Sequence, residues 1–206
     1  MCARFFLDED QEELLEIVAE MQRSPLSGRF LEAGHEVETS GEIRPTQVVP
    51  VIAPGKSRRK TVFPMKWGFR IRNGSLLINA RSETAAQKPT FRSAWERHRC
   101  IIPASWYFEW DHSVDGSGRS RNKYRIRSRG ASLTWLAGLY RIEDDLPVFT
   151  ILTKDPTADL RQIHDRMPLI LPKDRIEEWI RPDARPEELL PYAVSDLSVE
   201  NAALQL

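Results

Sequence analysis

The sequence has little of several features that would place a protein in a special class. It contains two cysteines, Cys2 and Cys100, which are too few for a disulfide framework and lack the spacing of a zinc site. No apolar run approaches the ~20 residues that a membrane-crossing helix needs. Acidic residues at positions 8–10 also argue against a secretory signal. These absences predict a cytoplasmic protein, in a reducing compartment, that uses neither a metal nor another cofactor and has no membrane partner.

The sequence also has no excess of either positive or negative charge. The 30 basic and 30 acidic residues give a formal net charge of zero. A protein that binds nucleic acid through general positive charge is therefore excluded, and any such site must be a local patch.

What the sequence does have is a series of short strand-like runs separated by Gly, Pro, Asn and Asp. This pattern predicts an α+β fold, one domain over residues 2–206, with a mostly antiparallel, barrel-like β core and a few peripheral helices. The expected strands are VVPVI, TVFPMKWGF, SLLINA, RCIIPASWYFEW, KYRIRS, SLTWLAGLY and LPVFTIL. Helical patterns cover 8–24 and shorter stretches near 90–99, 159–164 and 173–180, whereas 25–41 is rich in turn residues.

The end of the chain has two open interpretations. Residues 173–206 are expected to form a C-terminal helix and a tail. The tail, SDLSVENAALQL, is either a disordered extension or a docking segment, and its composition does not decide between them.

Cys2 directly follows the initiator methionine. If Met1 is removed, Cys2 carries a thiol and a free α-amine on neighbouring carbon atoms. An α-amine titrates near pH ~7.7–8.0, so part of it is unprotonated at neutral pH. The two groups can condense with an aldehyde to a five-membered thiazolidine, or the thiol alone can attack an acyl group. The alternative is that Cys2 is only a small buried apolar residue.

Glu109 lies among aromatic residues in the segment PASWYFEW. Trp106, Phe108 and Trp110 would remove water from its carboxyl and raise the pKa, which suits an acid or base near neutrality. A structural ion pair is the alternative interpretation. The segment IHDRMP offers His164 for proton transfer and Arg166 for phosphate binding. The segment NARSE places Asn79, Arg81 and Glu83 at the end of a strand.

A row of cations occupies alternate positions near the middle of the chain. Side chains alternate between the two faces of a strand, so the regular part of this row should share one face, with Tyr124 and Ile126 directed into the core. The row either protects a sheet edge from aggregation or contacts phosphates, with Lys56–Lys60 as a second patch. Its members are Arg119, Arg121, Lys123, Arg125, Arg127 and Arg129.

Several segments, taken in order, resemble the SOS response-associated peptidase (SRAP) family, whose members are also called abasic-site processing proteins. These segments are MCAR, PTQ, FPMKWGF, NARSET, RCIIPASWYFEW and HDRMPLIL. The resemblance extends from Cys2 to about Pro172, and the last thirty or so residues carry no family signal. The chain differs from the pattern in three places. Ala3 and Trp106 stand where glycine is usual, and EIR precedes PTQ in place of a polar-aliphatic run.

The resemblance implies a sensor of abasic sites in single-stranded DNA. Family members remove Met1 themselves, which gives the family its peptidase name. Cys2 then forms a thiazolidine crosslink with the ring-opened sugar, which shields the lesion during DNA repair and the SOS response; hydrolase and lyase activities are implied too. Asn79 would position the Cys2 amine and the opened sugar. Glu109 would be the acid/base, and His164 would move protons at the sugar oxygen.

The resemblance also implies the contacts with DNA. Arginines would hold phosphates, and the aromatic–glycine segment at 67–69 would stack against and part the bases. The residues concerned are Arg4, Pro45, Trp67, Gly68, Phe69, Arg81 and Arg166. We expect a monomer that meets single-stranded DNA or single-strand/double-strand junctions and is nucleoid-associated when DNA-bound.

Two other functions stay open at this point. One is a thiol peptidase or amidase with Cys2 as nucleophile and His164 as base. The other is a non-covalent module for single-stranded or junction DNA. Thiazolidine chemistry needs both the thiol and the free amine, whereas an amidase needs only the thiol and a binding module needs neither.

Overall fold

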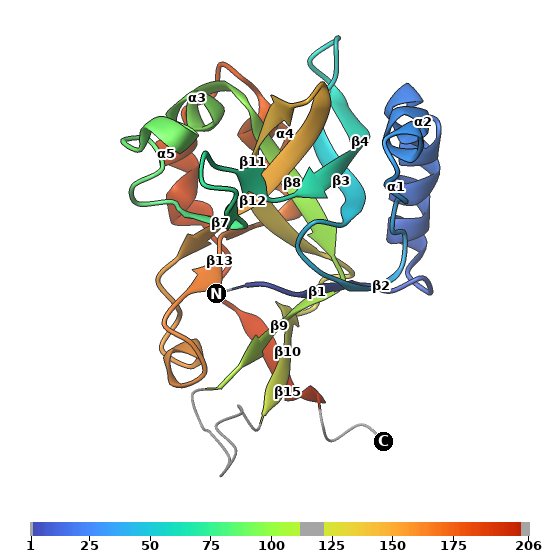
Figure 1. The fold of residues 1–206 in the computed structure, drawn as a ribbon. Helices are drawn as coiled ribbons and strands as arrows, with labels where there is room; N and C mark the ends of the chain where they lie inside the picture. The colour runs from blue at the N-terminus through green and yellow to red at the C-terminus, as the bar shows by residue number, and fades with distance from the viewer. Residues whose placement is uncertain (1, 112–121, 203–206) are drawn as a thin grey trace.

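The computed structural model describes residues 2–111 and 122–202, and within them five strands close into a barrel (Figure 1). The order around the barrel is β12-β4-β3-β8-β11, and β11 pairs again with β12. Only the β12–β4 pair in this circuit is parallel. The strands are β3 Val48–Pro54, β4 Lys60–Trp67, β8 Arg99–Ala104, β11 Thr134–Glu143 and β12 Leu146–Lys154. The predicted barrel-like, mostly antiparallel core is confirmed.

The barrel is closed where β4 meets β12. Val148 and Phe149 of β12 lie opposite Lys66 and Trp67. At Gly68 the backbone turns away with φ of +119°, a value that favours glycine, and its N–H donates to the Phe149 carbonyl at 2.7 Å. Further along β12, the short strand β7 (Asn79–Arg81) takes over the parallel pairing.

A second sheet lies against one end of the barrel, in the order β15-β10-β9-β1-β2 (Figure 1). Its strands are β1 Phe5–Leu7, β2 Gly41–Ile43, β9 Trp106–Trp110, β10 Lys123–Ser128 and β15 Leu197–Asn201. The run RCIIPASWYFEW, expected as one strand, is therefore two. It changes sheets at Ser105, whose N–H donates to the Phe6 carbonyl at 2.8 Å.

Helices cover the barrel from outside. The helix α1 (Glu12–Gln22) buries Leu14, Val18 and Met21, which are spaced by three and four residues as an amphipathic helix requires. Arg99 is fully buried and donates to the carbonyls of Trp95 and Trp179, which ties α3 and α4 to β8. The other helices are α2 Pro25–Glu32, α3 Pro89–Arg97, α4 Ile176–Ile180 and α5 Pro186–Leu189, with 3₁₀ turns at Leu160–Gln162, Lys173–Arg175 and Leu190–Tyr192.

Four two-residue strands complete the described secondary structure. They are β5 Phe69–Arg70, β6 Leu76–Leu77, β13 Met167–Pro168 and β14 Ile170–Leu171. No helix in the described part of the chain is long and apolar enough to cross a membrane.

Two expectations about local structure are wrong. The stretch 25–41 begins with the helix α2 instead of being only turns. Pro25 occupies its first turn, where a missing N–H costs nothing, and the Ser24 hydroxyl accepts a hydrogen bond from Leu26 N at 3.4 Å. The C-terminal segment is neither a disordered extension nor a free docking segment over Leu197–Asn201, because these residues form β15 and pair with β10.

Candidate functional site

Asn79 connects the barrel to the start of the chain. The preceding residue is held by Trp67, whose indole Nε1–H donates to the Ile78 carbonyl at 2.9 Å. The Asn79 side-chain amide in turn donates from Nδ2 to the Cys2 carbonyl at 2.9 Å. Its other atom, Oδ1, is buried and has no hydrogen-bond partner among the described residues. An acceptor is therefore left available next to Cys2.

Cys2 is fully buried beside β9. The Arg4 carbonyl accepts a hydrogen bond from Phe108 N at 2.9 Å, which brings the first residues of the chain alongside β9. Burial, followed by the nearby carboxyl of Glu109, raises the pKa of the Cys2 thiol. The thiol is therefore neutral in this environment at physiological pH.

Glu109 is the carboxyl that Cys2 meets. Its exposed fraction is 4%, and burial raises its pKa from an ordinary value of 4.5 to about 7. The carboxyl can therefore both give and take a proton near neutral pH. The aromatic surroundings in the sequence predicted such a raised pKa, although Trp106 and Trp110 are on the opposite face of β9 from Glu109.

Tyr107 is a site residue that the sequence analysis missed. It is fully buried two positions before Glu109, so the two side chains share the inner face of β9. Its hydroxyl has no hydrogen-bond partner in the described part of the chain. Burial raises its pKa, and the charges of Cys2 and Glu109 add to the effect. The spacing of two from Glu109 was the available signal.

The segment that carries His164 and Asp165 lies near Glu109. The His164 Nδ1 atom lies 2.8 Å from the Asp165 Oδ1 atom and accepts from Arg166 N at 3.1 Å. The Asp165 carboxylate contributes to the raised pKa of Glu109, so this segment faces Glu109 electrostatically. A role for His164 in proton transfer stays a prediction.

Of the arginines expected on phosphates, Arg81 is the most available. It is exposed on β7, two residues from Asn79 and on the same face of the strand, while Ala80 between them is buried. Arg4 is partly exposed and pairs with Glu42 at 3.3 Å. Both positions are compatible with the contacts that we expect.

Arg166 does not fit a phosphate contact in this arrangement. Its side chain is 8% exposed and is surrounded by protein acceptors. It pairs with Asp155 and with Glu83 (2.7 Å), and it donates to the Thr153 carbonyl at 2.9 Å. The structure gives it a bracing role instead, since it joins the segment after β7 to the end of β12.

The rings expected to stack against bases are also in a different place. Trp67 and Phe69 are fully buried in the core, and Gly68 between them is buried too. Trp67 lies parallel to Phe149, with centroids 6.0 Å apart and planes at 10°. Neither ring is exposed to a base in this conformation, so their stacking against DNA stays a prediction. Pro45 is half-buried, and Thr46 after it adopts a φ of +79° and donates from N to the Trp67 carbonyl at 2.9 Å.

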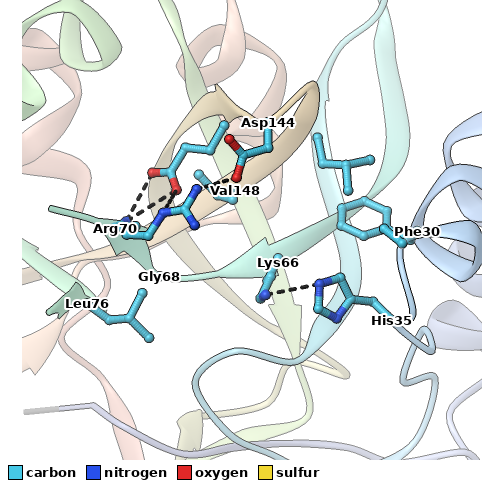
Figure 2. Close-up of a pocket in the computed structure, with 11 residues that line it drawn as sticks. Phe30, His35, Lys66, Gly68, Arg70, Leu76, Asp144 and Val148 are labelled. Atoms are coloured by element: carbon cyan, nitrogen blue, oxygen red, sulfur yellow. Dashed lines mark hydrogen bonds and ion pairs between the residues drawn. The ribbon is translucent and has the colours of Figure 1, made fainter. Parts of the chain in front are cut away.

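A separate pocket of about 240 Å³ opens beside Gly68 (Figure 2). Figure 2 shows Lys66 directed at His35, with 3.1 Å between Nζ and Nε2, and Arg70 paired with Asp144. Burial and Lys66 lower the pKa of His35, so Lys66 donates to a neutral ring. None of the Cys2 site residues lines this pocket.

Metal ligation is not suggested by the geometry. No three His, Cys, Asp or Glu side chains within residues 2–111 and 122–202 are grouped so that they could hold a metal ion. The groups available for chemistry at Cys2 are its thiol, the buried Glu109 carboxyl with a pKa of about 7 and the Asn79 amide.

Comparison with known proteins places this arrangement in a family. The family model described as SOS response associated peptidase (SRAP) matches residues 1–204. The chain belongs to the SRAP family. It is 32% identical over 179 residues to the abasic site processing protein YoaM of Bacillus subtilis, a match that covers 79% of this chain and 77% of that protein. It is 28% identical over 202 residues to YedK of Escherichia coli, also named an abasic site processing protein, with 95% and 86% covered.

Solved structures show that this SRAP fold is shared. A protein from Bacteroides thetaiotaomicron matches with a TM-score of 0.72 at 21% identity, covering 96% of this chain and 91% of that one. A protein from Bordetella bronchiseptica matches with a TM-score of 0.71 at 23% identity, covering 98% and 99%. These likenesses support the fold.

Proposed function

We propose that this SRAP protein processes abasic sites in single-stranded DNA by forming a covalent crosslink through Cys2 after removal of Met1. The crosslink shields the lesion during DNA repair and the SOS response. Relatives in the same family are named abasic site processing proteins. The observation that most supports this proposal is the nearly fully buried Glu109 beside Cys2, with a pKa raised to about 7.

The chemistry balances within the residues of the site. The Cys2 amine adds to the aldehyde of the ring-opened sugar, and the carbinolamine loses its hydroxyl as water to give an imine. A proton from Glu109 makes that hydroxyl a leaving group, and the Glu109 carboxylate takes a proton back from the nitrogen as the neutral imine forms. The Cys2 sulfur then attacks the imine carbon, the thiol proton passes to the nitrogen, and the ring closes. The products are one thiazolidine and one water.

The remaining residues have supporting roles in this proposal. Asn79 holds the Cys2 main chain through Nδ2, and its unpartnered Oδ1 accepts from the amine or from a sugar hydroxyl. His164 transfers protons at the sugar oxygen. Arg81 and Arg4 contact the neighbouring phosphates.

The surroundings of the thiol weigh against a thiol peptidase or amidase. Such enzymes activate the sulfur by lowering its pKa with a cation or a base. Here burial and a carboxyl raise the pKa of Cys2. A non-covalent DNA-binding module would have no use for a carboxyl with a pKa near 7 beside a buried thiol. Thiazolidine formation uses both.

Intact-mass measurement tests the proposal. The protein is measured alone and after mixing with single-stranded DNA that carries one abasic site. We expect loss of Met1 and an adduct equal to protein plus DNA minus one water, stable to denaturation. Cys2→Ala should form none, whereas Cys100→Ala, which removes the other buried thiol, should form the adduct normally.

A chain with an uncleaved residue ahead of Cys2 completes the test, because it keeps the thiol but turns the amine into an amide. It should bind the DNA without forming the adduct. An adduct in that chain would support attack by the thiol alone, and retention of Met1 in the unmodified protein would refute the mechanism.

A further inference from the structure

The outer face of the second sheet bears a hollow lined by aromatic rings. Phe6 and Trp106 are cross-strand partners on β1 and β9, and their rings stack with centroids 4.5 Å apart and planes at 6°. Phe108 stands edge-on to both, with its centroid 6.5 Å from each. The hollow measures about 320 Å³. Its remaining walls are Glu42, Lys123, Arg125 and Ala202.

Cations lie directly on these rings. The Lys123 ammonium is 3.7 Å from the Phe108 ring centroid. The Arg125 guanidinium carbon is 4.9 Å from the Trp106 ring centroid. Both belong to the row of alternating cations on β10, whose other face carries the buried Ile126. Arg119 and Arg121 of that row lie outside the described residues.

The face has more cations than carboxylates to pair with them. Glu42 is contacted by three of them, Arg4, Arg44 and Lys123. Glu200 is contacted by two, Arg125 and Arg127. Each carboxylate is therefore shared, and this group of ion pairs keeps a net positive charge in a protein whose formal net charge is zero. A polyanion is the partner that complements it.

We propose that this hollow binds a nucleotide of the same DNA strand that reaches Cys2, with the base against the rings and its phosphates beside Lys123 and Arg125. The inference rests on the proposed function for the identity of the strand. Aromatic rings together with cations bind single-stranded nucleic acid without sequence preference, because every base has a π-face. The Trp106 Nε1–H, which is buried without a hydrogen-bond partner in the described chain, supplies a donor at this wall.

The hollow is within reach of Cys2. Phe6 follows Cys2 by four residues, so even a fully extended backbone separates them by at most about 14 Å. The Arg4 carbonyl between them is bonded to Phe108 N, which ties the two places together. The two places lie on opposite faces of β9, so a strand bound at Cys2 has to pass the end of the sheet and meets the hollow a few nucleotides from the lesion.

The inference is tested by removing single bases from the DNA while the residues of the hollow are left unchanged. Cys2→Ala protein is used so that only non-covalent binding is measured, by fluorescence anisotropy of labelled single strands. A tetrahydrofuran spacer, which lacks both base and aldehyde, is moved along the strand on either side of a fixed abasic analogue. We expect one or two positions a few nucleotides away where losing the base weakens binding about five- to a hundredfold.

Substitutions then assign that position to the hollow. Trp106→Ala should weaken binding of the intact strand by the same factor and have no further effect on the strand lacking that base, whereas Trp106→Phe should bind normally. Trp110→Ala is the matched control, because it removes an indole from the same strand and face but not from the hollow. Equal effects of Trp106→Ala and Trp110→Ala, or a scan with no sensitive position, would overturn the inference.

The test is separate from that of the proposed function. A sensitive position found with Cys2→Ala, in a protein whose unsubstituted form gives no crosslink, would support the hollow and refute the crosslink. Normal crosslinking, together with a scan in which no base removal weakens binding, would support the crosslink and refute the hollow.

Discussion

Replacing Glu109 by glutamine should stabilise the protein at pH 8 and leave its stability almost unchanged at pH 4.5. Glutamine has nearly the same shape but no charge. In the folded protein burial raises the pKa of Glu109 from 4.5 to about 7, so the native state holds a proton that the unfolded chain releases. Ionised Glu109 therefore costs stability, and the cost grows as pH rises.

The size of the effect follows from the shift. Each pKa unit corresponds to about 1.4 kcal/mol, so the penalty reaches ~3 kcal/mol above pH 7. Below pH 4.5 both states are protonated and the penalty vanishes. Between pH 4.5 and 7 the native state binds more protons than the unfolded state, so the free energy of unfolding falls with pH through this window. Glu109→Gln should lack that fall.

Urea unfolding of both proteins at several pH values from 4.5 to 8.5 measures the difference. The stability of Glu109→Gln relative to the unsubstituted protein should increase by ~3 kcal/mol across the range. Glu9→Gln, at an exposed position, should show no comparable trend. A difference that does not vary with pH would refute the reasoning. Glu109→Gln should also slow crosslinking by roughly 10²- to 10⁴-fold, as expected for loss of a general acid.

The other predictions concern the amide and two arginines. Asn79→Ala should slow single-turnover crosslinking at least about two- to tenfold, through loss of the bond to the Cys2 carbonyl; an unchanged rate would exclude a role for Asn79. Arg81→Ala should weaken binding to all single strands alike and reduce the salt dependence by about 0.7 in log–log slope, with unfolding unchanged. Arg166→Ala should instead lower the free energy of unfolding by about 1–3 kcal/mol, because the buried Thr153 carbonyl loses its donor, whereas Glu83 and Asp155 are exposed enough to stay solvated. Urea unfolding equal to that of the unsubstituted protein would show that Arg166 does not brace the fold.

The strands of the core were predictable because their runs are apolar and bounded by turn residues. The closing of the barrel was not, because it depends on parallel pairing of β12 with β4 and β7, which are far away in sequence. Local pattern says nothing about such pairings. The stretch 25–41 reads as turns because proline and glycine are rare inside helices, but Pro25 occupies the first turn of α2, where proline is tolerated.

The candidate site shows the same division. The family motifs identified Asn79 and Glu109 as site residues. The aromatic residues beside Glu109 predicted that its carboxyl is desolvated. The motifs could not tell on which face of a strand a ring lies, so Trp67 was assigned to DNA although it is in the core. Arg166 was assigned to phosphate because its two acidic partners, at positions 83 and 155, are distant in sequence.

Strand β9 explains how one segment can serve two purposes. Side chains alternate along it, so Tyr107 and Glu109 enter the buried site of Cys2 while Trp106 and Phe108 face the hollow on the other side. The inner face must exclude water so that the pKa of Glu109 stays near 7. The outer face must stay accessible if it is to bind a base. A one-residue slip of β9 would exchange the two faces and destroy both. The pairing of β9 with β1 on one side and β10 on the other therefore positions the buried Glu109 carboxyl and the aromatic wall together.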